Sequence, residues 1–159
     1  MNHFTIARVI HILAIVVWIG GVAMVTTVII PAVKRMKSKT DKVNTFEELE
    51  GRFSFQAKIT TLLTAISGFY MIYELDAWNR YFDLKYWWFW AMTIVWLLFT
   101  LVLFVLEPFI LHKLYKKYAN NNPETTFEFI HKFHIILLSI SLITIAGAMA
   151  GSHGLFFVK

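Results

Sequence analysis

Four long stretches without a charged side chain constrain this sequence more than any other feature. They cover residues 9–33, 59–73, 86–106 and 133–158. An α-helix rises about 1.5 Å per residue, so roughly 20 apolar residues cross the ~30 Å hydrocarbon core of a bilayer. Three of the stretches reach that length. The pattern therefore predicts helices that cross a membrane.

The second stretch is short, but the apolar pattern begins before its first residue. Phe53, Phe55 and Ala57 precede Lys58, whose long aliphatic stem can lie along an apolar surface while its ammonium group reaches the headgroups. The first stretch is too long for a signal peptide and has no Ala-x-Ala-type cleavage site, so we interpret it as a retained helix. The expected fold is all-α, an integral membrane four-helix bundle in a single transmembrane domain over residues 1–159, with helices at about 5–33, 55–74, 86–111 and 129–156.

Composition narrows the chemistry that the chain can perform. Hydrophobic residues make up 58% of the 159 residues and charged residues only 16%, and a soluble domain of this size could not bury so much apolar surface. The sequence has no cysteine, which excludes disulfides, thiolate metal ligands and covalent haem attachment. The net charge of +5 comes from cations that flank apolar runs, which favours anionic lipid headgroups as partners and argues against nucleic acid.

Lysine and arginine are distributed unequally between the two sides of the predicted bundle. Eleven lie in the connections between the first and second and between the third and fourth spans, and four lie elsewhere. Because basic loops stay in the cytoplasm, both termini and the loop 74–85 are expected on the outer, periplasmic side. The predicted location is the bacterial inner membrane, with a multi-pass topology.

Histidines are the candidate ligands, and the predicted topology places them at two depths. The outer group is His3, His11 and His153, and the inner group is His112, His131 and His134. Imidazoles on facing helices at a common depth are the arrangement that holds a haem iron from both sides in a four-helix bundle. The sequence therefore predicts one or two haem b groups per chain.

His11 is the strongest single candidate, because it lies inside the first apolar run. Arg8 precedes it by about one turn, and a guanidinium group matches a haem propionate in a two-bonded fork. We predict that His11 and His153 hold an outer haem, with Met149 as the substitute for His153. His3 is a further alternative ligand at this end.

For the inner haem, the predicted ligands are His112 and His134, with His131 as the alternative. The connection between the third and fourth spans is short, so these helices should be antiparallel neighbours that bring the ligands to matching depth. Gly147 and Gly151 have the GxxxG spacing that lets a helix or a flat porphyrin approach the backbone. Glu107, near the inner end of the third span, is a candidate proton or quinone site.

One part of the sequence resembles a known family. The stretch RVIHILAIVVWIGGVAMVTTVIIPAVKR, followed by EELEGRF and TLLTAISGFYMI, is similar to the copper-resistance protein D (CopD) superfamily of small membrane proteins. The residues that carry the resemblance are His11, Trp18, Gly20, Gly21, Pro31, Ala32, Arg52, Phe53 and Gly68. The layout also resembles the HemJ-type protoporphyrinogen oxidases, which hold haem b through a histidine in the first helix, and the second half looks like a di-haem membrane cytochrome b.

These observations lead to one functional prediction and two alternatives. We predict a membrane-embedded b-type haem protein, an oxidoreductase that transfers electrons and exchanges them with a quinone or a redox protein. The first alternative is copper binding or transport of the CopD type, with copper held by His3, His11, Met149 and His153. The second is a HemJ-like protoporphyrinogen oxidase. The sequence leaves the redox partner, the number of haems and the choice between monomer and homodimer open.

Overall fold

The computed structural model describes residues 3–111, 115, 118 and 122–155, and every element in these residues is helical. The elements in chain order are α1 (His3–Met24), the π-helical η1 (Val25–Ile29), α2 (Ile30–Lys34), α3 (Lys39–Glu74), the short 3-10 helices η2 (Trp78–Phe82) and η3 (Leu84–Tyr86), α4 (Trp87–Leu101), the π-helical η4 (Val102–Leu111) and α6 (Pro123–Ser152). The predicted all-α fold is confirmed for the described residues.

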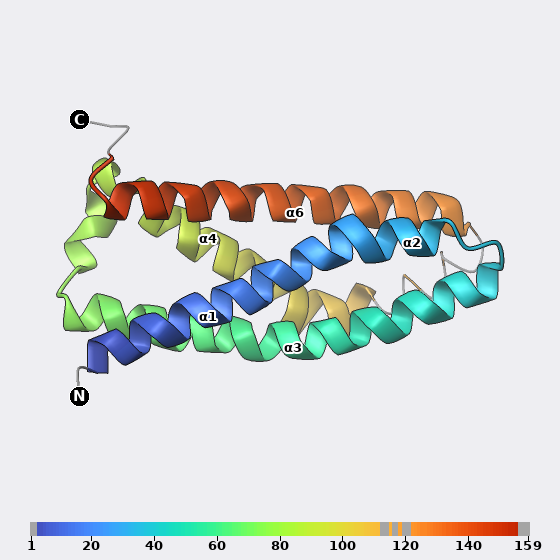
Figure 1. Cartoon of the computed structure of the whole chain (residues 1–159), viewed down its shortest axis with the longest axis horizontal. Helices are drawn as coiled ribbons and strands as arrows, with labels where there is room; N and C mark the ends of the chain where they lie inside the picture. Colours follow the sequence, from blue (N-terminus) through green and yellow to red (C-terminus); the bar gives the residue numbers. More distant parts are fainter. Residues whose placement is uncertain (1–2, 112–114, 116–117, 119–121, 156–159) are drawn as a thin grey trace.

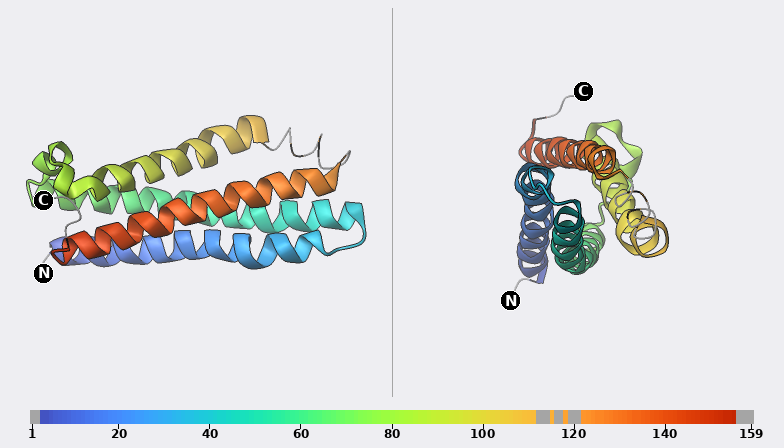
Figure 2. Two further views of the ribbon diagram at one scale, coloured as in Figure 1. Left: turned by 90° about the horizontal axis from the view of Figure 1, so that it is seen from above. Right: turned by 90° about the vertical axis from the view of Figure 1, so that its right-hand side faces the viewer.

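Four long helical rods lie side by side along the molecule (Figures 1 and 2). The first rod is α1, η1 and α2 in succession, the second is α3, the third is α4 with η4, and the fourth is α6. The start of α1, the end of α6, and η2 with η3 lie at one end, which we call the terminal end (Figure 1). The turn between α2 and α3 lies at the opposite end, which we call the basic end. The predicted up-and-down order therefore agrees with the structure.

Both π-helical segments lie at a proline. Pro31 follows η1 directly, and Pro108 lies inside η4. Proline has no N–H and its ring clashes with the preceding turn of an α-helix, and one way to relieve both problems is to widen the turn. The first rod therefore continues from residue 3 to residue 34 without a break.

The second rod, α3, extends well beyond the span that its apolar residues predict. It begins at Lys39, where the N-cap Ser38 accepts a hydrogen bond from the N–H of Asp41 at 3.3 Å. With 36 residues it is about 54 Å long, so it exceeds the hydrocarbon core of a bilayer. Its charged first half lies toward the basic end and its apolar second half toward the terminal end.

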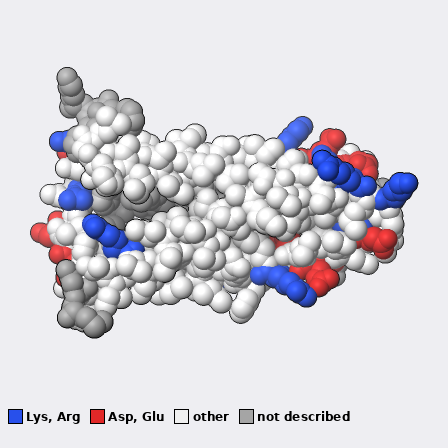
Figure 3. All heavy atoms as spheres, in the orientation of Figure 1, with Lys and Arg blue, Asp and Glu red and all other residues white. Residues whose placement is uncertain are grey.

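Among the described residues, three helices are long and apolar enough to cross a membrane: His3–Lys34, Leu84–Phe109 and Pro123–Ser152. The surface agrees with this reading, because charged side chains gather at the two ends and the middle of the visible face carries none (Figure 3). Large apolar side chains are exposed along the middle of the rods, as at Leu13 (59%), Ile66 (69%) and Ile143 (64%). An apolar surface of this extent is typical of a lipid-facing or partner-facing protein.

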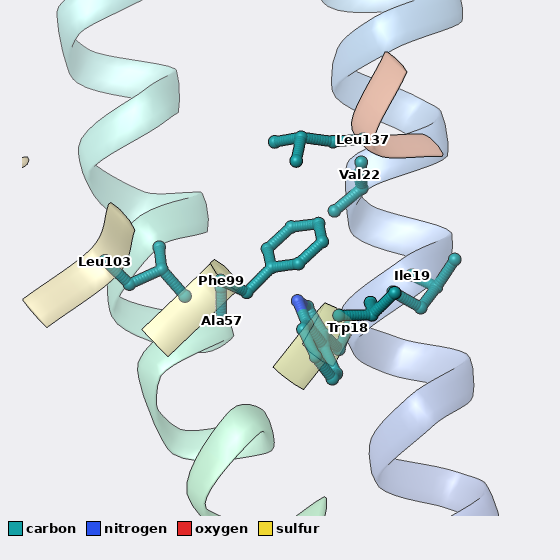
Figure 4. Close-up of a cluster of buried hydrophobic side chains, with 8 residues drawn as sticks. Trp18, Ile19, Val22, Ala57, Phe99, Leu103 and Leu137 are labelled. Atoms are coloured by element: carbon teal, nitrogen blue, oxygen red, sulfur yellow. The ribbon is translucent and has the colours of Figure 1, made fainter. Parts of the chain in front are cut away.

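The centre of the bundle is a cluster to which all four rods contribute (Figure 4). Trp18 of α1 packs its ring edge-to-face against Phe99 of α4, with 4.9 Å between centroids. Ala57 of α3 and Leu137 of α6 complete the cluster around them. This core fixes the rods relative to one another midway between the ends.

A second core lies at the basic end. Its buried members are Val25, Ile30, Val33, Phe46 and Phe127. Beside it, the ammonium group of Lys42, a residue only 3% exposed, bonds to the carboxylate of Glu124 at 2.7 Å. The rods are therefore packed beyond the apolar segment as well as within it.

The buried face of the apolar half of α3 is made of small side chains, and it meets both the first rod and α4 with η4. The buried residues on this helix include Ser54, Ala57, Thr60, Thr61, Thr64 and Ser67. Their hydroxyl groups bond mainly to carbonyls of their own helix, as Thr64 does to Thr60 at 2.8 Å. Small residues of this kind allow close approach between helices in a membrane. This face of α3 receives His11.

Candidate functional site

His11 lies between α1 and α3, about midway along the α1 half of the first rod. Its Nδ1 is 2.9 Å from the carbonyl oxygen of Thr64 and 3.1 Å from the hydroxyl of Ser67. A carbonyl oxygen only accepts hydrogen bonds, so Nδ1 carries the proton. In the neutral ring, Nε2 then holds the lone pair that can bind a metal.

Gly68 provides the space for this imidazole. A Cβ placed on Gly68 would lie 3.0 Å from Cε1 of His11 and 3.4 Å from Nδ1, so the ring rests close to the α3 backbone. Together with the bond to Thr64, this contact fixes the orientation of the ring. His11 and Gly68 both belong to the stretches that carry the resemblance to the CopD superfamily.

The hydrogen bond of His11 is of the kind that metal-binding histidines make. Metal-binding histidines usually donate the N–H of one ring nitrogen to a carbonyl or carboxylate, and this bond sets the orientation and tautomer of the ring. His11 donates in this way to Thr64, which leaves Nε2 as the ligating nitrogen. The side chain therefore meets the orientation requirement for one ligand of haem iron.

His153 is the predicted partner of His11. It lies at the same end of the bundle, where it is the C-cap residue of α6. Its side chain is exposed, and Nδ1 donates to the carbonyl of Met149 in its own helix at 2.8 Å. The lone pair is again on Nε2. Met149, the predicted substitute, is 55% exposed. The structure thus brings His11 against α3, whereas the contacts of His153 are within α6.

The GxxxG surface of α6 is covered by aromatic side chains. A Cβ on Gly147 would clash with the ring of Trp87, and one on Gly151 would clash with the ring of Trp88. These indoles come from the first turn of α4, and Trp88 is only 4% exposed. The small residues of α6 therefore accommodate α4, which agrees with helix packing, one of the two alternatives given for the GxxxG spacing.

The other predicted residues at the terminal end are exposed. Arg8 places its guanidinium carbon 5.1 Å from the ring centroid of Phe4, and His3 lies at the start of α1. Figure 3 shows that the surface is hollowed near this end, between the first rod and α6, with Lys or Arg side chains at the rim.

At the basic end, the structure describes two of the three predicted histidines. His134 is partly buried and donates from Nδ1 to the carbonyl of Ile130 at 2.9 Å, so its Nε2 holds the lone pair. His112 lies outside the described residues. The predicted pairing of His112 with His134 therefore stays a prediction.

His131 has a contact that the sequence analysis did not identify. Its Nε2 donates to the carbonyl of Thr26 at 3.0 Å. In a π-helical segment each N–H bonds to the carbonyl five residues earlier, as Ile30 does to Val25. In this pattern the Thr26 carbonyl would accept from residue 31. Residue 31 is proline, which has no N–H. His131 supplies the missing donor. Pro31 inside an apolar helix was the signal in the sequence for such a freed carbonyl.

Glu107 belongs to a polar cluster between α3 and η4. The hydroxyl of Ser54 donates to the Glu107 carboxylate, and Nζ of Lys58 is 3.2 Å from the same group. Burial and the charge of Glu107 raise the pKa of Glu50, which precedes the apolar half of α3, to about 7. Glu107 was a candidate from the sequence, whereas its interactions with Glu50, Ser54 and Lys58 of α3 were not predicted.

Two further findings concern the possible metal ligands of the chain and its relation to known proteins. Within the described residues, no three His, Asp or Glu side chains form a group that could hold a metal ion. No protein-family model, curated protein or solved structure matches the chain. The resemblance to the CopD superfamily therefore stays a prediction from the quoted stretches.

Proposed function

We propose that the chain is an integral protein of the bacterial inner membrane, with the terminal end outside and the basic end in the cytoplasm. Three apolar helices of sufficient length, an uncharged middle surface and exposed apolar side chains support this proposal. The apolar second half of α3 is the fourth span. Its charged first half extends toward the cytoplasm, where Phe46 packs against Phe127 of α6.

Within this frame, the function that the geometry supports best is that of a b-type haem protein that transfers electrons. The observation that carries the proposal is the setting of His11, whose Nδ1 is bonded to the Thr64 carbonyl and whose ring rests on Gly68. An imidazole held in this way presents Nε2 in a fixed direction. When bound, haem supplies one-electron oxidation and reduction.

The remaining residues have supporting roles in this proposal. Arg8 pairs with a propionate at the terminal end, where its guanidinium is exposed. His153 or Met149 provides the second axial ligand from the end of α6. His134, with Nδ1 bonded to its own helix, is the described ligand candidate for a second haem at the basic end, with His112 as its proposed partner. A quinone or a redox protein exchanges the electrons.

The test is the visible spectrum of the purified protein, with a pyridine haemochrome assay to count haem per chain. We expect a Soret band with sharp α and β bands on reduction. His11→Ala should lose one haem or convert it to a different spin state while the bundle stays helical. Asn79→Ala is the control, because Asn79 is an exposed polar residue at the same end, and it should keep the wild-type spectrum.

Other outcomes would point to other functions. Full haem content and an unchanged spectrum in His11→Ala would contradict the assignment of His11. Bound copper without a Soret band would favour the CopD-type alternative. Oxidation of protoporphyrinogen by the haem-loaded protein would favour the HemJ-like alternative.

A further inference from the structure

A groove lies between the first rod and α3. Its volume is about 390 Å³, and its lining residues are Gly20, Gly21, Met24, Val25, Ile29, Arg52, Phe53 and Gln56. Four of them, Gly20, Gly21, Arg52 and Phe53, are among the individual residues that carry the family resemblance. The proposed haem ligands do not line it.

The floor of the groove is largely apolar, and part of it is bare backbone. No atom lies within 4 Å of the position that a Cβ on Gly20 would occupy. The neighbouring Gly21 is covered by the ring of Phe53. Met24 is 52% exposed and lines the groove about one turn beyond Gly20. An extended hydrocarbon chain fits a floor of this kind.

The polar side of the groove consists of two α3 side chains. Arg52 is 78% exposed and pairs with Glu48, one turn earlier in the same helix, at 2.8 Å. Gln56 directs its amide toward the carbonyl of Val17 at 3.4 Å. An exposed ion pair contributes little to stability, so an anionic ligand can replace Glu48 as the partner of Arg52 at low cost. The guanidinium group favours phosphate, which it binds through two parallel hydrogen bonds.

The groove also lies where the surface changes character. Gly20 and Met24 are within the charge-free run 9–33, whereas Arg52 belongs to the charged half of α3. In the proposed membrane orientation, this level corresponds to the boundary between acyl chains and headgroups in the leaflet next to the basic end. A ligand in the groove therefore has an anionic head at Arg52 and an apolar body against Gly20.

We propose that this groove binds an anionic phospholipid, with Arg52 bonded to the phosphate and an acyl chain lying against Gly20 and Met24. The proposal rests on the membrane orientation proposed above and is independent of haem binding. The abundant basic residues at this end attract anionic lipids in general. The groove adds a defined position for one of them.

The experiment compares lipid retention by the full chain in detergent, measured by native mass spectrometry. The probes are phosphatidylglycerol and phosphatidylcholine with identical acyl chains. We expect the wild type to retain several-fold more phosphatidylglycerol than phosphatidylcholine. Arg52→Gln should reduce this preference to near one, and Arg35→Gln, which removes an exposed arginine outside the groove, should keep it. Gly20→Leu, which fills the groove, should retain less of both lipids.

Equal effects of Arg52→Gln and Arg35→Gln would overturn the proposal, because they would show diffuse attraction by surface charge. The proposal would also be overturned if a folded Gly20→Leu protein retained as much lipid as the wild type. A wild-type dimer that forms without lipid and dissociates in Gly20→Leu would overturn it too, because a second copy of the chain would then occupy the groove. Arg52→Gln removes no packing in the core, so its result is decisive even where Gly20→Leu fails to fold. Haem content measured in the same samples reports separately on the proposed function.

Discussion

At the scale of single residues, the histidines differ in which ring nitrogen is bonded. His11, His134 and His153 each donate from Nδ1 to a backbone carbonyl, whereas His131 donates from Nε2 to Thr26. The first three leave Nε2 free to ligate a metal. The bond of His131 instead satisfies a carbonyl that Pro31 leaves without a donor. His131 and His134 lie about one turn apart on α6 but form different hydrogen bonds. His131 bonds to the first rod, and His134 bonds to its own helix.

This difference gives a prediction for His131. Replacing it with alanine removes the only described donor to the Thr26 carbonyl, and an unsatisfied buried carbonyl costs about 1–3 kcal/mol. In the background Pro31→Ala, residue 31 has an N–H that can bond to Thr26, so His131→Ala should cost much less there. Thermal unfolding of the four proteins in detergent measures this coupling. Equal costs in the two backgrounds would contradict the role assigned to His131.

A second prediction at this scale concerns pH. The pKa of Glu50 is raised from its ordinary value near 4.5 to about 7, first by burial and then by the charge of Glu107. The charge of Lys58 opposes this increase, and the charge of Glu47 adds to it. The folded state therefore holds the proton more tightly than the unfolded state does. The contribution to stability is complete below about pH 4.5 and is lost as the pH rises to 7.

The test is stability as a function of pH for Glu50→Gln, which cannot titrate. Its free energy of unfolding should fall less than that of the wild type between pH 4.5 and 7. Glu48→Gln is the control, since Glu48 is an exposed carboxylate on the same helix paired with Arg52. Parallel curves for Glu50→Gln and the wild type would show that Glu50 has an ordinary pKa.

At the scale of helices, the sequence predicted the existence of the rods better than their lengths and contacts. Charge-free runs identify the rods because three of the four runs are long enough to span a bilayer. The first half of α3 carries many charges, so an analysis based on apolar runs does not include it. The contact between Trp88 and Gly151 depends on the rotation of α4 about its axis, which spacing within one helix cannot supply.

The packing of α4 on α6 leads to a prediction for Gly151. A Cβ at this position clashes with Trp88, so Gly151→Val should destabilise the bundle by roughly 1–3 kcal/mol through overpacking. Trp88→Ala should remove the clash and recover part of the loss, although by itself it leaves a cavity. The measurement is a double-mutant cycle of thermal unfolding. If the two effects simply add, Trp88 does not fill the space beside Gly151.

The candidate site was predictable in part for a related reason. The position of His11 inside an apolar run identified it as a candidate, since buried ionisable groups in a span are costly. Its partners Thr64 and Ser67 lie on another helix, and they depend on the register between α1 and α3. Similarly, Ser54 and Lys58 reach Glu107 only because η4 lies against the middle of α3.

At the scale of the whole molecule, the ends of the bundle differ in both charge and length. The apolar segments of all four rods overlap near the terminal end, and helices continue beyond them at the basic end around the second core. In the sequence, eleven lysines and arginines lie between the predicted first and second or third and fourth spans, and four lie elsewhere. The positive-inside rule therefore predicts that the basic end lies in the cytoplasm.

The last prediction tests this orientation with a reporter fused after Lys159. A reporter that is active only outside the cytoplasm should be active there, and one fused within the connection between α2 and α3 should be inactive. Changing Lys34, Arg35, Lys37 and Lys39 to glutamine should increase the share of inverted molecules, because it removes the basic residues closest to the first span. A C-terminal reporter that is inactive outside and active inside the cytoplasm would reverse the orientation. His11 and Arg8 would then lie toward the cytoplasm, and the lipid groove would face the outer leaflet.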